Sequence, residues 1–276
     1  MEAPTKEPFP EQANAKLLEL MSLSARLILE NGGETYRVEE TVRHMGKKEG
    51  CTVEIIALPT AIFIMLETPE GQQAAALPLS PGGGQGRRHM FLQSIRSRTV
   101  NLGKIDRVNA ISRRFCSGRL TLDQALEGLR EVDCPPKDEK LRLLVCWSLA
   151  AGFFALLFGG GWFDFLMAAC SGALVTLALQ YAPSLASSYF ISSLITGFVT
   201  TSIAVLAPRW AGVGNTNSIV VGGIMPFLPG LALTNSFRDT MAGDLVSGGA
   251  RLGETLVRAA ALAFGAGAAL AVLSAL

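Results

Sequence analysis

The feature that most constrains this sequence is the near absence of charge after residue 142. Of its 47 Lys, Arg, Asp and Glu residues, 38 lie within residues 1–140. Residues 143–161 include no charged residue over 19 positions, close to the ~20 apolar residues that an α-helix needs to cross a bilayer. The chain is therefore expected to divide into an N-terminal domain, residues 1–136, and an all-α transmembrane domain, residues 137–276.

Five spans are expected in the transmembrane domain. Four are predominantly apolar: residues 143–161, 163–181, 188–207 and 259–276. The remaining span, the fourth in the chain, lies within residues 215–244. There Gly222, Gly223, Pro226 and Pro229 are expected to break the helix, because proline removes a backbone donor and glycine favours disorder. Backbone groups freed in lipid must be buried in protein or line a polar cavity, so the break is expected to handle a small polar solute.

Polar residues follow this break immediately. A helix beginning near residues 234–236 would present free N–H groups to a carboxylate, with Arg238 as its ionic partner. The alternative is a solvated amphipathic helix held together by ion pairs. The candidate substrate-binding residues are Gly230, Thr234, Asn235, Arg238 and Asp239.

Two aspartates are candidates for proton coupling. Asp164 begins the second span and Asp244 follows the fourth, and an ionisable residue within a membrane is costly enough to suggest a function. For Asp164 the alternative is an interfacial residue at a helix N-terminus. No nucleotide-binding loop or nucleophile motif appears, so we expect no catalytic residue, cofactor or metal. The net charge of +1 gives no reason to expect nucleic acid.

The N-terminal domain is predicted to have an α+β fold. Helical spacing of apolar residues and β-type runs bounded by turns indicate its elements. The predicted helices are residues 13–31, 34–49, 102–115 and 122–132, and the predicted strands are residues 52–58, 61–68 and 90–98. Thr121 is the expected N-cap of the last helix, and residues 78–86 are expected to be flexible.

Charged residues of this domain are candidates for gating or for docking onto the transmembrane domain. They are Glu34, Arg37 and Glu39, with Arg251 as a candidate on the membrane side. The alternative is that this mixed-charge helical turn is only a cap with solvated ion pairs. Small residues four apart in the last span, Ala261, Gly265 and Ala269, indicate close packing with another helix of the same or another chain.

The orientation follows from the basic residues. Lys137, Lys140 and Arg142 precede the first span and Arg238, Arg251 and Arg258 lie between the fourth and fifth, whereas the alternating loops have only Arg209. Cytoplasmic loops carry the excess of Lys and Arg. The N-terminus also lacks an apolar signal segment, so the N-terminal domain is expected in the cytoplasm and the C-terminus outside.

Four motifs, in order, resemble the threonine/serine exporter family of bacterial inner-membrane proteins. They are NGGETYRVEETV (31–42), LPTAIFI (58–64), RTVNLGKIDRVNAISRR (98–114) and GIMPFLPGLALTNSFRDTMAGDLVSGGARL (223–252). The resemblance implies a secondary exporter of small amino acids or of carboxylic acids such as succinate. It also implies the split form of the family, in which a short multi-span membrane partner completes a homo- or hetero-oligomeric exporter in the lipid bilayer.

Other classes of function remain as alternatives. The second hypothesis is a membrane-anchored regulatory or scaffold protein without transport activity. A membrane-tethered hydrolase is the third, and it lacks a nucleophile and base at recognisable spacing.

Overall fold

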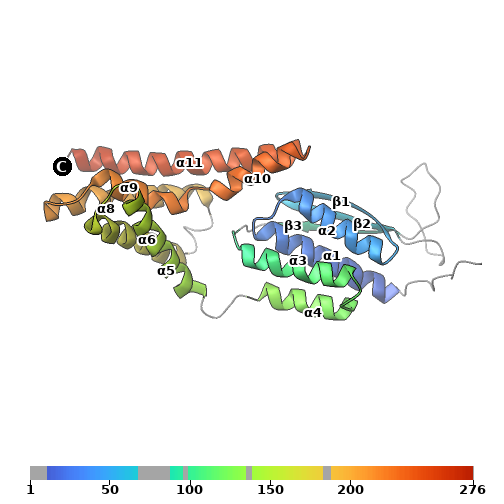
Figure 1. Ribbon diagram of the computed structural model, residues 1–276. Helices are drawn as coiled ribbons and strands as arrows, with labels where there is room; N and C mark the ends of the chain where they lie inside the picture. The colour runs from blue at the N-terminus through green and yellow to red at the C-terminus, as the bar shows by residue number, and fades with distance from the viewer. Residues whose placement is uncertain (1–10, 68–87, 96–98, 135–138, 183–187, 276) are drawn as a thin grey trace, which may run out of the picture. The chain divides into compact units, whose positions relative to one another are not determined.

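The chain forms two compact units in the computed structural model, which describes residues 11–67, 88–95, 99–134, 139–182 and 188–275 (Figure 1). The first unit comprises Met1–Pro135 together with Thr234–Arg251. The second comprises Pro136–Leu233 and Leu252–Leu276. The segment that follows the helix break therefore belongs to the same unit as the N-terminal domain.

The N-terminal domain contains the four helices and three strands that the sequence predicts. They are α1 (Glu11–Glu30), α2 (Thr35–Lys48), β1 (Thr52–Leu58), β2 (Ala61–Glu67), β3 (Arg88–Ser94), α3 (Leu102–Cys116) and α4 (Leu122–Asp133). Thr121 caps α4 in a reciprocal capping box with Gln124, which confirms its predicted role. The segment 78–86, expected to be flexible, lies outside the described residues.

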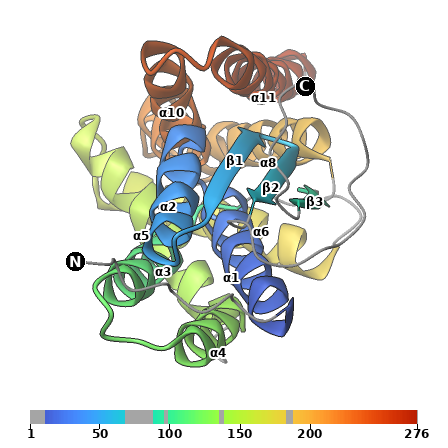
Figure 2. The ribbon, with the colours of Figure 1, turned by 90° about the vertical axis from the view of Figure 1, so that its right-hand side faces the viewer.

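Helices cover one face of an antiparallel sheet in the order β1-β2-β3. Helices α1 and α2 contact the strands, and α3 and α4 pack against α1 (Figure 1). The core is built where the apolar stripe of α1 meets the inward side chains of β2, as Leu17 and Leu20 meet Ile62 and Ile64, all fully buried. Seen end on in Figure 2, α1 lies between the sheet on one side and α3 and α4 on the other.

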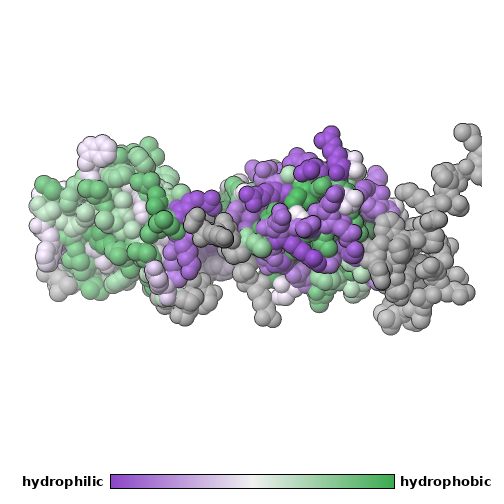
Figure 3. Space-filling view, turned by 90° about the horizontal axis from the view of Figure 1, so that it is seen from below, coloured by the Kyte–Doolittle hydropathy of each residue, from purple (hydrophilic) through white to green (hydrophobic). Residues whose placement is uncertain are grey.

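The described residues of the second half of the chain form helices joined by short turns. Its elements are α5 (Glu139–Leu157), α6 (Trp162–Tyr181), α8 (Tyr189–Ala211), α9 (Thr216–Ile224), the 3₁₀ turn η1 (Met225–Phe227), α10 (Gly230–Met241) and α11 (Leu245–Ser274). Figure 3 shows a mostly hydrophobic surface over the second unit and a mostly hydrophilic one over the N-terminal domain.

Four helices in the described part of the chain are long and apolar enough to cross a membrane. They are Lys140–Leu157, Trp162–Tyr181, Tyr189–Ala211 and Leu245–Ser274. Thr216–Phe227 and Gly230–Met241 are bent by 49° relative to each other and add a fifth crossing if they act as one span. The last helix begins at Leu245, earlier than the span predicted at residue 259, and it runs without interruption from a polar start into an apolar end.

The break in the fourth span differs from the prediction in its position. Gly222 and Gly223 lie inside α9 and are buried, so they do not form the break. Their missing side chains instead allow close packing: a Cβ on Gly222 would lie 2.5 Å from the backbone nitrogen of Ala155, and one on Gly223 would collide with Thr200. The interruption itself is at residues 225–229, where Pro226 lies in η1 and Pro229 precedes α10.

Helix α11 packs closely against α8 within the second unit. A Cβ on Gly197 of α8 would collide with the carbonyl of Leu262, and one on Gly265 would collide with the carbonyl of Leu194. Ala261 and Ala269, which flank Gly265 at four-residue spacing, are fully buried. The predicted small-residue stripe therefore faces another helix of the same chain.

Candidate functional site

A polar cluster joins the α1–α2 turn to the segment Thr234–Arg251, entirely within the first unit. The turn contributes backbone carbonyls and the start of α2, and the segment contributes side chains from α10 and α11. The turn and the segment are about 200 residues apart in the sequence, so no local sequence pattern predicts their contact. The polar cluster consists of Gly32, Gly33, Glu34, Thr35, Asn235, Arg238, Asp239, Asp244 and Arg251.

Two glycines shape the turn that receives the segment. Gly32 has a φ of 90°, in the left-handed region that favours glycine, and a Cβ on Gly33 would collide with Ile28. The carbonyl of Gly32 accepts a hydrogen bond from Asn235 Nδ2 at 2.7 Å. The carbonyl of Gly33 accepts one from an Arg251 terminal nitrogen at 2.8 Å. The turn therefore supplies acceptors to both α10 and α11.

The N-terminus of α2 is capped by residues from the distant segment. Its own N-cap, Glu34, makes no side-chain capping bond. Instead, the Thr35 N–H donates to Asp239 Oδ1 at 3.2 Å, and the Thr35 hydroxyl donates to Asp244 Oδ2 at 2.9 Å. A carboxylate is favoured there, because the first N–H groups of a helix have no intrahelical partner and carry partial positive charge.

Ion pairs complete the polar cluster. Glu34 lies between two arginines: Oε1 is 2.7 Å from an Arg238 terminal nitrogen, and Oε2 is 2.9 Å from Arg37 Nε. Asp239, which is fully buried, pairs with Arg251 at 3.3 Å. The Arg238 side chain is 56% exposed whereas that of Glu34 is 7% exposed. One edge of the polar cluster is therefore accessible to solvent and the other is buried.

The start of α11 is fixed by the same residues. Asp244 Oδ1 accepts a hydrogen bond from the Ser247 N–H at 3.0 Å, which caps the helix. The Ser247 hydroxyl donates to the carbonyl of Ala57 in β1 at 3.4 Å. This cap explains why α11 begins at Leu245 rather than in the apolar run further on.

The candidate binding residues from the sequence fall into two groups. Asn235, Arg238 and Asp239 belong to the polar cluster, whereas Gly230 is the first residue of α10 and Thr234 is exposed on it. Because α10 begins at Gly230, directly after Pro229, residues 234–236 lie inside the helix. The predicted helix N-terminus at those residues is therefore wrong, and within the polar cluster the start of α2 is bonded to the carboxylate of Asp239.

The candidate gating and docking residues are also partly brought together. Glu34, Arg37 and Arg251 lie in or against the polar cluster. Glu39 does not: its carboxylate accepts a hydrogen bond from the Ala57 N–H at 3.2 Å and pairs with Arg43. The sequence analysis missed the carbonyls of Gly32 and Gly33 and the hydroxyl of Thr35. Their only sequence signal is the Gly-Gly pair that directly precedes Glu34.

Asp164 forms a separate polar site in the second unit. Its Oδ2 accepts a hydrogen bond from the Gly161 N–H at 2.8 Å, which caps α6. Its Oδ1 accepts one from the Asn215 N–H at 2.8 Å, just before α9. Asp164, which is 3% exposed, thus joins the start of α6 to the start of α9. Asp244, the other candidate for proton coupling, caps α11.

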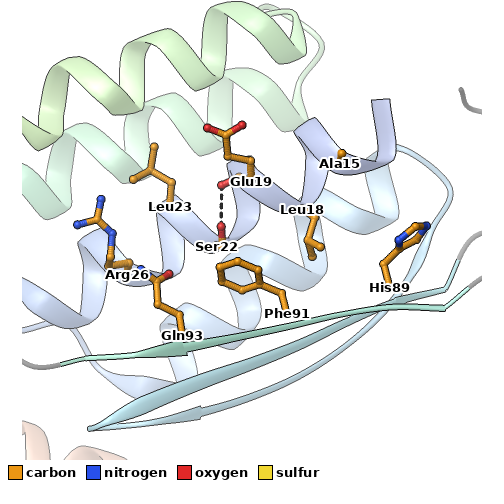
Figure 4. Close-up of a pocket in the computed structure, with 9 residues that line it drawn as sticks. All are labelled: Ala15, Leu18, Glu19, Ser22, Leu23, Arg26, His89, Phe91 and Gln93. Atoms are coloured by element: carbon orange, nitrogen blue, oxygen red, sulfur yellow. Dashed lines mark hydrogen bonds between the residues drawn. The ribbon is translucent and has the colours of Figure 1, made fainter. Parts of the chain in front are cut away.

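An open groove of about 400 Å³ lies between α1 and β3 (Figure 4). Phe91 and Leu18 form part of its apolar lining. Its charged groups already have partners, because Arg26 pairs with Glu30 and Asp133, and Glu19 pairs with Arg130. We favour the polar cluster as the functional site, because it contains Asn235, Arg238 and Asp239, which follow the helix break, whereas the groove lies within the N-terminal domain.

Long apolar helices, a bent helix pair and an α+β domain with a buried polar cluster define a multi-pass membrane protein. A family model described as "Putative threonine/serine exporter" matches residues 19–273. The chain belongs to this family, which is a family of transporters.

Two curated relatives agree with that family. The chain is 25% identical over 256 residues to a Mycobacterium tuberculosis protein named "Probable threonine/serine exporter", an alignment that covers 91% of this chain and 45% of the relative. It is 27% identical over 173 residues to the "Threonine/serine exporter" of Corynebacterium glutamicum, covering 61% of this chain and 35% of the relative. The chain thus spans less than half the length of these relatives. No solved structure matches it.

Proposed function

We propose that this chain forms the solute-handling part of a secondary exporter of threonine, serine or a related small carboxylate such as succinate. The observation that carries the proposal is the polar cluster directly after the bend at residues 225–229, with Arg238 of α10 exposed at its edge. A guanidinium is well suited to bind a carboxylate. The names of the two curated relatives support the amino-acid substrates.

The proposal includes a topology with five crossings. Three uninterrupted spans, α5, α6 and α8, separate the N-terminal domain from the bent pair. Asn235 and Arg251, which follow the bend, bond to the α1–α2 turn, and these bonds require both to lie on the same side of the membrane. With α5, α6 and α8 proposed as three crossings, this arrangement supports one further crossing by the bent pair and argues against a re-entrant loop.

The orientation is proposed from charge. Lys140 and Arg142 lie in the first turn of α5, Arg238 lies in α10, and Arg251 and Arg258 lie in the first half of α11, whereas Arg209 lies at the end of α8. The excess of basic residues favours a cytoplasmic location for the N-terminal domain. We propose the bacterial inner membrane as the location, with the end of α11 outside.

A membrane partner is also proposed. The motifs of this chain resemble the split form of the family, and we propose that a short multi-span membrane protein completes the exporter in a homo- or hetero-oligomer. Coupling to the proton-motive force, with Asp164 or Asp244 as the titrating group, is the simplest source of energy for export, since a carboxylate in a membrane can carry a proton.

Export from cells tests the proposed function. Cells that express the protein with its proposed partner are loaded with threonine, serine or succinate, and the extracellular solute is measured by mass spectrometry. Arg238→Ala should abolish export without lowering the amount of protein in the membrane. The matched control is Arg43→Ala, because Arg43 is also about half exposed and paired with one glutamate.

The results separate the competing functions. Wild-type export that is lost only in Arg238→Ala supports the proposal. Unchanged export in Arg238→Ala would contradict the role of Arg238 in binding the substrate carboxylate. Absence of export for all three solutes would favour the membrane-anchored regulatory or scaffold protein.

A further inference from the structure

Glu34 holds a fixed carboxylate beside the arginine that the proposed function assigns to the substrate. The distance from Glu34 Oε1 to the Arg238 terminal nitrogen is 2.7 Å, and the other oxygen of Glu34 is 2.9 Å from Arg37. The Glu34 side chain is almost buried whereas those of Arg238 and Arg37 are about half exposed. A negative group is thus held in place at the buried end of a solvent-accessible cation.

We infer that Glu34 determines substrate specificity by binding the α-ammonium group of an amino acid whose α-carboxylate binds Arg238. This inference rests on the proposed function and deepens it. An ammonium and a carboxylate on one carbon are a matched pair for a carboxylate and a guanidinium that lie side by side. A dicarboxylate would instead place its second negative charge against Glu34, which Coulomb repulsion disfavours.

The contacts of Glu34 leave its carboxylate able to accept a hydrogen bond from an ammonium group. Arg238 bonds to it through one terminal nitrogen, while a guanidinium has five N–H donors in a planar fork. Each carboxylate oxygen can accept more than one hydrogen bond. Both residues therefore keep hydrogen-bonding capacity beyond their mutual bond, and the exposed side of Arg238 faces solvent.

The polar cluster does not depend on the Glu34–Arg238 pair for its integrity. Asn235 and Arg251 bond independently to the α1–α2 turn, and Thr35 bonds to Asp239. The substitution Glu34→Gln keeps the size of the side chain and an oxygen acceptor while it removes the negative charge. It should therefore change selectivity and leave the fold in place.

Transport into inside-out membrane vesicles tests the inference, with radiolabelled threonine and succinate as substrates. N-acetylthreonine, which has the carboxylate but no ammonium group, serves as a competitor. Wild-type protein should prefer threonine to N-acetylthreonine, and Glu34→Gln should raise the half-saturating concentration of threonine by about tenfold or more, since a hydrogen bond to a charged group contributes at least that factor. The same substitution should improve succinate transport, because it removes the repulsion of the second carboxylate, and should remove most of the discrimination against N-acetylthreonine.

The control is Glu40→Gln, because Glu40 is exposed on the same helix, and it should behave as wild type. An equal loss of threonine and succinate transport in Glu34→Gln would show a structural role and overturn the inference. An equal gain for the two substrates, or no change for either, would also overturn it. Absence of transport of both substrates by wild-type protein, in vesicles from cells that also express the proposed partner, would contradict the proposed function itself. Transport by wild type with unaltered selectivity in Glu34→Gln would contradict only the role of Glu34.

Discussion

The backbone N–H of Thr35 donates a hydrogen bond to the carboxylate of Asp239, 204 positions further along the chain. The bond places a buried carboxylate from α10 at the N-terminus of α2, where the helix dipole favours negative charge. The same carboxylate pairs with Arg251 of α11. One residue therefore connects three helices of the first unit, and the segment after the helix break is held by the N-terminal domain.

Asp239→Asn should destabilise the first unit. The neutral amide removes the negative charge that pairs with Arg251 and stabilises the N-terminus of α2. Breaking a buried ion pair lowers the free energy of unfolding by about 3 kcal/mol. We expect the thermal unfolding midpoint of the detergent-solubilised protein to fall by roughly 5 °C or more. Asp123→Asn is the control, because the Asp123 side chain is 72% exposed in its ion pair with Lys16 and an exposed pair contributes ~0–1 kcal/mol. Equal shifts for the two variants would contradict the role of Asp239.

Gly222→Ala should disrupt the packing of α9 against α5. The new Cβ would lie 2.5 Å from the Ala155 backbone nitrogen, and overpacking typically costs about 1–3 kcal/mol. Gly253→Ala in α11 meets nothing within 4 Å, so alanine should be tolerated and could add up to ~1 kcal/mol from helix propensity. Thermal stability of both variants checks this prediction, and a Gly222→Ala protein as stable as wild type would contradict it.

The glycines of this stretch show where sequence reasoning succeeds and where it stops. Pro226 and Pro229 mark the break because proline acts locally on the chain. Gly222 and Gly223 carry the same local signal as a helix-breaking glycine, yet they lie inside α9 because Ala155 and Thr200 approach them there. A close approach between helices depends on tertiary packing, and the spacing of residues along one helix does not reveal it.

Asp164→Asn should weaken the joint between α6 and α9. Each oxygen of Asp164 accepts one backbone N–H, and an asparagine has one acceptor oxygen for the two donors. The unsatisfied donor should cost about 1–3 kcal/mol, measured as a lower thermal midpoint together with reduced export. A variant with wild-type stability whose export no longer depends on pH would instead favour the proton-coupling role of Asp164.

Glu30 should make the stability of the N-terminal domain depend on pH. Burial raises the pKa of the Glu30 carboxyl above its ordinary value of 4.5, and the nearby Arg26 offsets part of that effect. The folded protein therefore binds this proton more tightly than the unfolded chain, and stability falls as pH rises from 4.5 through the folded-state pKa. Glu30→Gln cannot titrate, so its stability relative to wild type should increase over that interval. A constant difference in thermal midpoint across the interval would contradict the raised pKa.

The elements of the N-terminal domain follow from the sequence because their signals are local. Apolar spacing within α1 and the capping box of Thr121 each lie within a few residues of the structure they determine. The polar cluster is different, since Glu34 and Arg238 are distant in sequence and either one alone resembles a solvated helix charge. Their pairing depends on the path of the chain through the whole fold.

The central claim is that the segment between α10 and α11 lies on the same side of the membrane as the N-terminal domain. Single cysteines at Val213, Ala242 and Glu40, in a variant whose five native cysteines are replaced, test it by labelling intact cells with a membrane-impermeant maleimide. Val213 lies between α8 and α9 and is 58% exposed, whereas Ala242 lies between α10 and α11 and is also exposed. We predict that the cysteine at 213 is labelled in intact cells, and that those at 242 and 40 are labelled only after permeabilisation. Labelling at 242 without labelling at 40 in intact cells would place the two segments on opposite sides and contradict the polar cluster.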